Sequence, residues 1–184
     1  MTTTSASDPD VPLCFDTSVV RDFTRSAKFL VDCKRTWPNR GILLPAVVVA
    51  EQVRHWIRDM RKPFDRSKFA SFLSNYSVPG FDADVALDGW HAVLCVLRPA
   101  PPAPWPWRYD EVPAPLKRSR NDACAHVCRW PDHAIQAIAI HHQALLVTDD
   151  GALLDAMATR SPGAVRKQVI EALVTPSATT SSKA

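Results

Sequence analysis

The sequence lacks any apolar run of the eighteen or so residues that would cross a lipid bilayer. Its first ten residues, MTTTSASDPD, have neither the basic stretch nor the apolar stretch of a signal peptide. Charge of one sign is also scarce, since 22 Lys and Arg face 19 Asp and Glu, which leaves a net charge of +3. So small an excess is only a weak indication of a polyanionic partner. We therefore expect a cytoplasmic protein without a membrane association.

Cysteines are few, odd in number and scattered. They are Cys14, Cys33, Cys95, Cys124 and Cys128. Cys14 and Cys95 lie in apolar segments, where a thiol behaves as a small hydrophobic group, so a disulfide scaffold is not expected. A second small group contains Cys124, His126, Cys128 and His133. Its spacing matches no common structural zinc site, and alternating positions diverge on a helix, so we expect no zinc there.

The 184 residues suffice for one well-buried core, and we expect a single domain over residues 11–175. Small polar residues predict flexible tails at 1–10 and 176–184. Residues 98–120 hold seven of the sixteen prolines and fit neither helix nor strand, so we interpret them as an insertion.

Strand-like and helix-like segments alternate through the domain. Strands are expected at 11–15, 41–44, 77–81 and 144–148 and near Leu173, and helices at 17–34, 46–60, 66–75, 82–97, 131–142, 152–158 and 165–171. The run AVVVAEQVRHWIRDM from Ala46 is ambiguous, because three valines favour a strand, but its later apolar spacing is helical. The alternation predicts an α/β fold with a mostly parallel sheet flanked by helices.

Acidic residues fall where a functional site is expected in such a fold. Ligands bind beyond the carboxyl ends of parallel strands, and Asp16 and the pair Asp149-Asp150 directly follow two predicted strands. Asp132 begins a predicted helix, and Glu51 lies within another. Three of these acids also have a structural alternative. Asp132 can cap its helix, Asp150 can serve an Asp-Gly turn or cap the next helix, and Glu51 can be a solvated helix residue.

A cluster of carboxylates would need a cation, because like charges repel. Oxygen ligands without convergent His or Cys favour Mg²⁺ or Mn²⁺ over zinc. Such an ion can position and acidify a water for attack on a phosphodiester and screen the charge that develops on phosphorus.

Four ordered segments resemble the motifs of the PIN-domain superfamily, and of VapC-type toxin ribonucleases in particular. They are CFDTSVV from Cys14, LPAVVVAEQ from Leu44, DHAIQAIAIHHQALLVTDD from Asp132 and, within the last, TDD from Thr148. The eighteen residues from Asp132 to Asp150 are typical of that family. The resemblance covers residues 11–175 and implies a PIN-like three-layer fold.

The resemblance implies an endoribonuclease that depends on Mg²⁺ or Mn²⁺, the toxin of a toxin–antitoxin pair. Its catalytic and metal-binding acids would be Asp16, Glu51, Asp132 and Asp150. Accessory residues would be Thr17, Ser18, Thr148 and Asp149. Thr17 or Ser18 would orient a metal-bound water or a phosphate, and Asp150 is preferred over Asp149 because it lies two residues after the Thr. The implied partners are RNA, a cognate antitoxin and a second copy of the chain.

The insertion carries aromatic and basic residues, namely Trp105, Trp107, Tyr109, Lys117, Arg118 and Arg120. Such side chains can stack on unpaired bases and contact phosphates. More often such tryptophans fix a proline-rich loop to the core, and the same surface could instead receive an antitoxin.

Two other enzyme classes and one non-enzymatic function fit these residues less well. A dehalogenase-like phosphatase needs a second acid two residues after Asp16, where this chain has Ser18. A response-regulator receiver has its paired acids early, whereas here the pair is late. The alternative from another class is a catalytically silent PIN-like scaffold that binds RNA or protein, and the presence of all four acids disfavours it.

Overall fold

The computed structural model of the chain describes residues 6–20, 23–58, 65–90, 130–158 and 160–175. The predicted insertion at 98–120 and the C-terminal tail at 176–184 lie outside these ranges. So does the end of the helix expected at 82–97.

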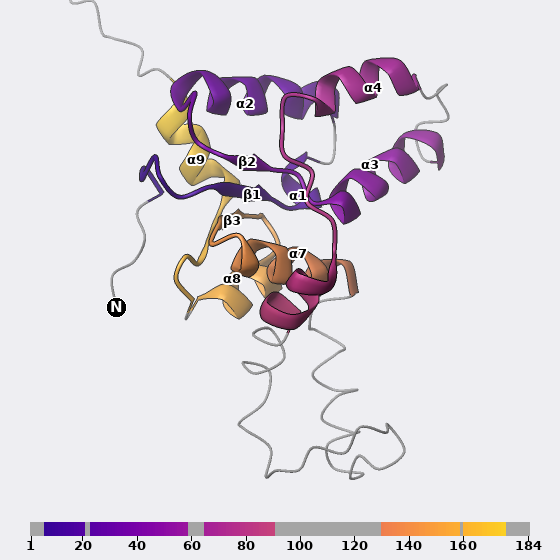
Figure 1. Cartoon of the computed structure of the whole chain (residues 1–184). Coiled ribbons are helices and arrows are strands. Elements are labelled where there is room, and N and C mark those ends of the chain that lie inside the picture. Colours follow the sequence, from indigo (N-terminus) through magenta and orange to yellow (C-terminus); the bar gives the residue numbers. More distant parts are fainter. Residues whose placement is uncertain (1–5, 21–22, 59–64, 91–129, 159, 176–184) are drawn as a thin grey trace, which may run out of the picture.

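A four-stranded, all-parallel sheet forms the centre of the molecule (Figure 1). Its strands are β1 (Leu13–Phe15), β2 (Ile42–Leu43), β3 (Leu145–Val147) and β4 (Ala164–Val165), in the order β2-β1-β3-β4. The central strands β1 and β3 pair from Leu13 with Leu145 to Phe15 with Val147. All six residues of these two strands are buried, as expected of strands that are covered on both faces.

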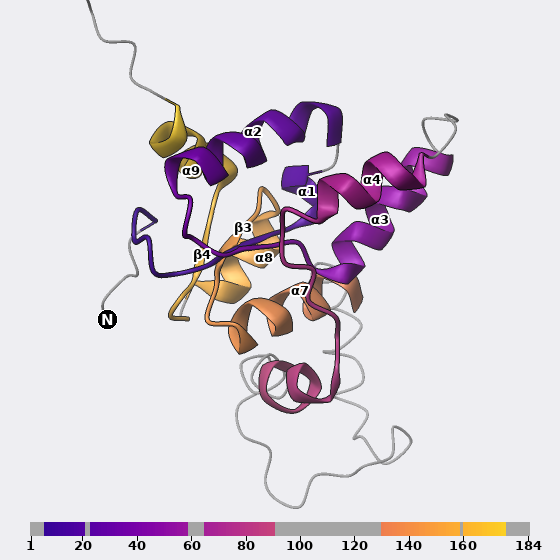
Figure 2. The same cartoon turned by 45° about the horizontal axis from the view of Figure 1, so that its top comes forward.

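Helices cover both faces of this sheet. Their bounds are α1 (Thr17–Val20), α2 (Phe23–Thr36), α3 (Ala46–Arg58), α4 (Arg66–Leu73), the π-helical turn η1 (Val85–Trp90), α7 (Trp130–His141), α8 (Gly151–Met157) and α9 (Lys167–Val174). In both views α2 and α9 lie on one side of the sheet, and α7 and α8 lie on the other (Figures 1 and 2). The predicted α/β fold, a parallel sheet flanked by helices in three layers, is confirmed.

Local sequence accounts for the ambiguous run from Ala46. It forms helix α3, which buries Val48 and Gln52 one helical turn apart and exposes Arg54. Helix α7 is more enclosed, because every residue from Ala134 to Ala139 is buried. Its apolar sequence suits a helix that is packed on most of its sides.

Two predicted strands are wrong. Residues 77–81 form only a single bridge, between Ser77 and Leu43, because Pro79 cannot donate a ladder hydrogen bond. Leu173 lies within α9 rather than in an edge strand. The edge strand is instead β4, whose second residue, Val165, had been expected to begin a helix.

No helix in the described ranges is long and apolar enough to cross a bilayer.

Arg40 closes the amino end of β1, and only 1% of its surface is exposed. Its Nε donates to the carbonyl of Val11 at 2.6 Å, and its Nη1 donates to that of Ala6 at 2.8 Å. The guanidinium also lies 4.7 Å from the centre of the Trp37 ring. These bonds hold part of the predicted N-terminal tail against the domain.

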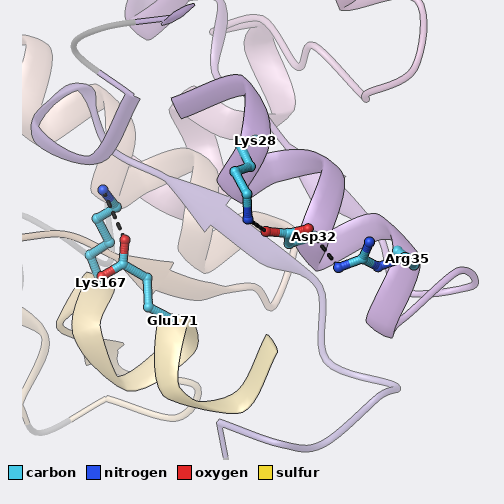
Figure 3. A network of polar contacts seen from close by, with 5 residues as sticks. All are labelled: Lys28, Asp32, Arg35, Lys167 and Glu171. Atoms are coloured by element: carbon cyan, nitrogen blue, oxygen red, sulfur yellow. Dashed lines mark hydrogen bonds and ion pairs between the residues drawn. The ribbon is translucent and has the colours of Figure 1, made fainter. Parts of the chain in front are cut away.

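Helix α2 carries an exposed group of charges. Asp32 accepts from Lys28 at 2.7 Å and from Arg35 at 2.8 Å, as Figure 3 shows. Both cationic side chains are largely exposed, so these ion pairs contribute little to stability.

Candidate functional site

The carboxyl edge of the sheet is where polar residues replace the apolar strands. Asp16 follows β1, Thr148 follows β3 and Arg166 follows β4. Because the strands are parallel, these ends meet on one edge, which is where ligands bind in sheets of this kind.

Asp16 is the buried acid of this edge, with 4% of its surface exposed. Its Oδ1 accepts from the Thr17 amide at 2.6 Å. Its Oδ2 accepts from the Ser18 hydroxyl at 2.6 Å, the Ser18 amide at 3.3 Å and the Thr148 hydroxyl at 2.8 Å. Four donors therefore replace the water that this carboxylate loses on folding.

The two hydroxyls also hold the turn that follows β3. The Ser18 Oγ accepts from the Asp149 amide, and the Thr148 Oγ1 accepts from the Asp150 amide, both at 3.0 Å. Each hydroxyl thus donates to Asp16 and accepts from one residue of the acidic pair. The backbone of this pair is fixed by a network centred on Asp16.

The side chains of the pair point their oxygens at two different helices. Asp150 is the N-cap of α8, where its Oδ1 accepts from the Ala152 amide at 2.7 Å and the Leu153 amide at 3.2 Å. Asp149 accepts from the amide of Lys167, the first residue of α9, at 3.2 Å. The capping alternative for Asp150 therefore describes its side chain in this arrangement.

Glu51 reaches the same edge from α3. Its Oε2 accepts a hydrogen bond from the hydroxyl of Thr17, the residue next to Asp16. Thr17 therefore connects Glu51 to Asp16, because its hydroxyl donates to Glu51 and its amide donates to Asp16. In this arrangement the Thr17 hydroxyl orients the carboxylate of Glu51.

Asp132 lies in the first turn of α7, as predicted, and is half-buried. Its helix packs against α3, which carries Glu51. The neighbouring His133 is also half-buried, and burial lowers the pKa of its imidazole.

The described residues contain no group of three or more Asp, Glu, His or Cys side chains that could together hold a metal ion. The structure links Asp16, Glu51 and the turn 148–150 by hydrogen bonds, but it does not bring the four predicted carboxylates around one point. The side-chain atoms that could bind a metal ion here are all oxygens, the ligand type that Mg²⁺ and Mn²⁺ prefer. Too few of them point to one position to form a complete metal site.

Comparison with known proteins does not assign this chain to a family. Neither the models of known protein families nor the curated proteins give a match to this chain. The functional interpretation therefore depends on the residues themselves.

Two residues of interest were missed by sequence reasoning. Gln52, beside Glu51, is 2% exposed, and its Nε2 has no hydrogen-bond partner in the described part of the chain. Arg166 follows β4, a strand of only two residues. The only signal for Gln52 in the sequence was its position one helical turn after Val48, on the apolar side of the expected helix. Recognition of β4 would have placed Arg166 at the carboxyl edge.

The six aromatic and basic residues of the insertion lie outside the described ranges. The roles of Trp105, Trp107, Tyr109, Lys117, Arg118 and Arg120 in RNA binding therefore stay predictions.

Proposed function

We propose that this protein is an endoribonuclease that hydrolyses RNA phosphodiester bonds with Mg²⁺ or Mn²⁺. The observation that carries the proposal is Asp16, a buried carboxylate at the carboxyl end of a central strand. Its hydrogen bonds join it to the turn of Asp149 and Asp150, and Thr17 joins it to Glu51.

The position of Asp16 supports a functional role beyond capping. A buried carboxylate is costly unless several donors surround it, and a cap needs only a surface position. Here the chain supplies donors from two separate segments, residues 17–18 and Thr148. Both segments follow central strands, at the edge where α/β proteins bind their ligands.

Asp16 and Glu51 would hold the ion, together with a carboxylate from Asp132 or Asp150. Asp150 would have to release the first amides of α8 to take part. When bound, such an ion acidifies a water and screens the charge that develops on phosphorus. The chain's own contribution is to fix the acids, because Thr148 and Ser18 orient Asp16 and Thr17 orients Glu51.

The biological role is proposed from the sequence resemblance alone. The four motif segments support a toxin of a toxin–antitoxin pair, inhibited by a cognate antitoxin and able to form a homodimer. A small neighbouring gene that encodes a DNA-binding N-terminal region would support this role.

A catalytically silent scaffold that binds RNA or protein is the second candidate. Two observations favour it. Asp149 and Asp150 both accept from amides at the starts of helices, and no three acids gather in the described residues. In that case the network around Asp16 would serve folding alone.

An assay of metal dependence separates the two candidates. The purified protein should cleave single-stranded RNA with Mg²⁺ or Mn²⁺ and should stop when EDTA is in excess. Cleavage that continues in EDTA would contradict the metal requirement. RNA binding without cleavage under any of these conditions would favour the silent scaffold.

A further inference from the structure

Arg166 lies beside the candidate site on the edge strand. Val165 of β4 pairs with Val147 of β3, and the Thr148 amide donates to the Val165 carbonyl at 3.0 Å. Arg166 is therefore the neighbour of Thr148, which binds Asp16. The next residue, Lys167, donates its amide to Asp149 at 3.2 Å.

Charge changes sign along this edge of the sheet. Asp16 follows β1 and the pair Asp149-Asp150 lies close to the end of β3, whereas Arg166 follows β4. Neighbouring strands lie ~4.8 Å apart, so the backbone of Arg166 is ~10 Å from that of Asp16. An anionic strand that approached the acids alone would be repelled, and a cation at this distance offsets that repulsion.

The two cations that follow β4 differ in their surroundings. The Lys167 Nζ lies 3.1 Å from Glu171 Oε1 (Figure 3) and 5.3 Å from the centre of the Phe29 ring. Arg166 is exposed, and its side chain makes no capping bond to α9 and no ion pair with the described residues. Arg166 thus keeps its guanidinium available, while Lys167 is directed to its own helix and to α2.

We propose that Arg166 binds a backbone phosphate of the RNA, adjacent to the phosphate that is cleaved at Asp16. This inference rests on the proposed function and names a subsite of the same edge. A guanidinium suits the task because its parallel N–H groups bind phosphate oxygens in pairs.

The test is the salt dependence of RNA binding, measured by fluorescence anisotropy with a labelled single-stranded oligonucleotide in EDTA, where cleavage is stopped. One phosphate contact contributes about 0.7 to the slope of log K against log salt. Arg166→Gln should lower the slope by about that amount and weaken binding roughly eightfold at 50 mM salt. Arg166→Lys should keep most of the slope.

The matched control is Arg35→Gln, on the exposed surface of α2 (Figure 3). It removes the same charge away from the carboxyl edge and should leave the slope unchanged. An Arg166→Gln slope equal to that of the wild type would overturn the subsite, and so would a wild type that binds no RNA. Equal melting temperatures of the variants exclude misfolding as the cause.

The measurements distinguish a failure of the subsite from a failure of the nuclease proposal. If Arg166→Gln lowers the slope but the wild type cleaves nothing with Mg²⁺ or Mn²⁺, the phosphate subsite stands and the nuclease fails. If the wild type cleaves and the slope is unchanged, only the subsite fails. If Arg166 binds a partner protein instead of RNA, Arg166→Gln should leave the salt slope of RNA binding unchanged.

Discussion

A buried charged residue closes each end of the central strand β1, and the two are held differently. Arg40 at the amino end is 1% exposed and donates to two backbone carbonyls, and its Nη2 has no hydrogen-bond partner in the described part of the chain. Asp16 at the carboxyl end is 4% exposed and accepts four hydrogen bonds, two of them from hydroxyls.

The difference lies in what each set of partners can do. The carbonyls that hold Arg40 belong to the N-terminal segment, so the charge ties one piece of backbone to another. The two hydroxyls that donate to Asp16 also accept hydrogen bonds from the amides of Asp149 and Asp150. Asp16 is therefore connected to the backbone of the acidic pair. We infer that Arg40 stabilises the fold, whereas Asp16 belongs to the candidate functional site at the carboxyl edge of the sheet.

The largest stability effect is expected at the amino end. Arg40→Ala leaves the carbonyls of Ala6 and Val11 without their donor and removes the packing against Trp37. The free energy of unfolding should fall by about 3 kcal/mol, measured by urea denaturation. The control Arg35→Ala removes an exposed guanidinium and should change it by less than about 0.5 kcal/mol. A similarly small change in the free energy of unfolding for Arg40→Ala would show that Arg40 has no structural role.

At the carboxyl end, Thr148→Val tests the network directly. Valine keeps the shape but leaves the Asp150 amide without its acceptor and Asp16 with one donor fewer. The free energy of unfolding should fall by about 2 kcal/mol, because the polar groups that lose a partner are buried or partly buried. Thr148→Ser, which retains the hydroxyl, should lose much less. Equal stability of the Val and Ser variants would show that the network contributes nothing.

The buried thiol of Cys33, in α2, predicts a dependence of stability on alkaline pH. Burial raises the pKa of the Cys33 thiol to about 12 from its ordinary value of 9.0, and the charge of Arg40 opposes that rise. Above pH 9 the unfolded thiol loses a proton that the folded thiol keeps. The free energy of unfolding should therefore fall with rising pH, by up to about 1.4 kcal/mol per pH unit.

The control for this titration is Cys33→Ala. Its stability should fall less steeply between about pH 9 and pH 10 than that of the wild type, whatever its absolute stability. Parallel curves for the two proteins would mean that the thiol does not titrate differently in the folded state.

The smallest expected change in stability concerns the cap of α8. Asp150→Ala should cost about 1 kcal/mol, whereas Asp150→Asn should cost little, because Asn caps helices almost as well as Asp. RNA cleavage separates the roles of this residue. If Asp150 also binds the ion, Asp150→Asn should lose cleavage while it stays folded.

Asp65 offers a matched control, since it caps α4 by accepting from the Lys68 amide at 3.0 Å. Asp65→Ala should cost about as much stability as Asp150→Ala and leave cleavage unchanged. Wild-type cleavage by Asp150→Asn would restrict Asp150 to capping.

Sequence patterns predicted the parts of the fold that depend on local signals. The buried run that ends at Asp16 and the apolar spacing after Val49 identified β1 and α3. The two-residue strand β4 was missed, because so short a strand has no period of its own. Its position depends on the pairing with β3, which a single segment does not encode.

The candidate site was predictable in its residues and not in its arrangement. Order along the chain placed Asp16 and the acidic pair at strand ends, and the structure puts them on one edge. The direction of each side chain depends on competition for donors. Asp150 turns to α8 because unpaired amides lie within its reach, which no pattern of residues could decide.

The most direct test of the central claim compares RNA cleavage by Asp16→Asn and Arg40→Ala with Mn²⁺, at a temperature where both variants are folded. Asp16→Asn, which keeps the size of the side chain, should abolish cleavage. Arg40→Ala should cleave at close to the wild-type rate despite its lower stability. Wild-type cleavage by folded Asp16→Asn would contradict the assignment of this edge as the active site.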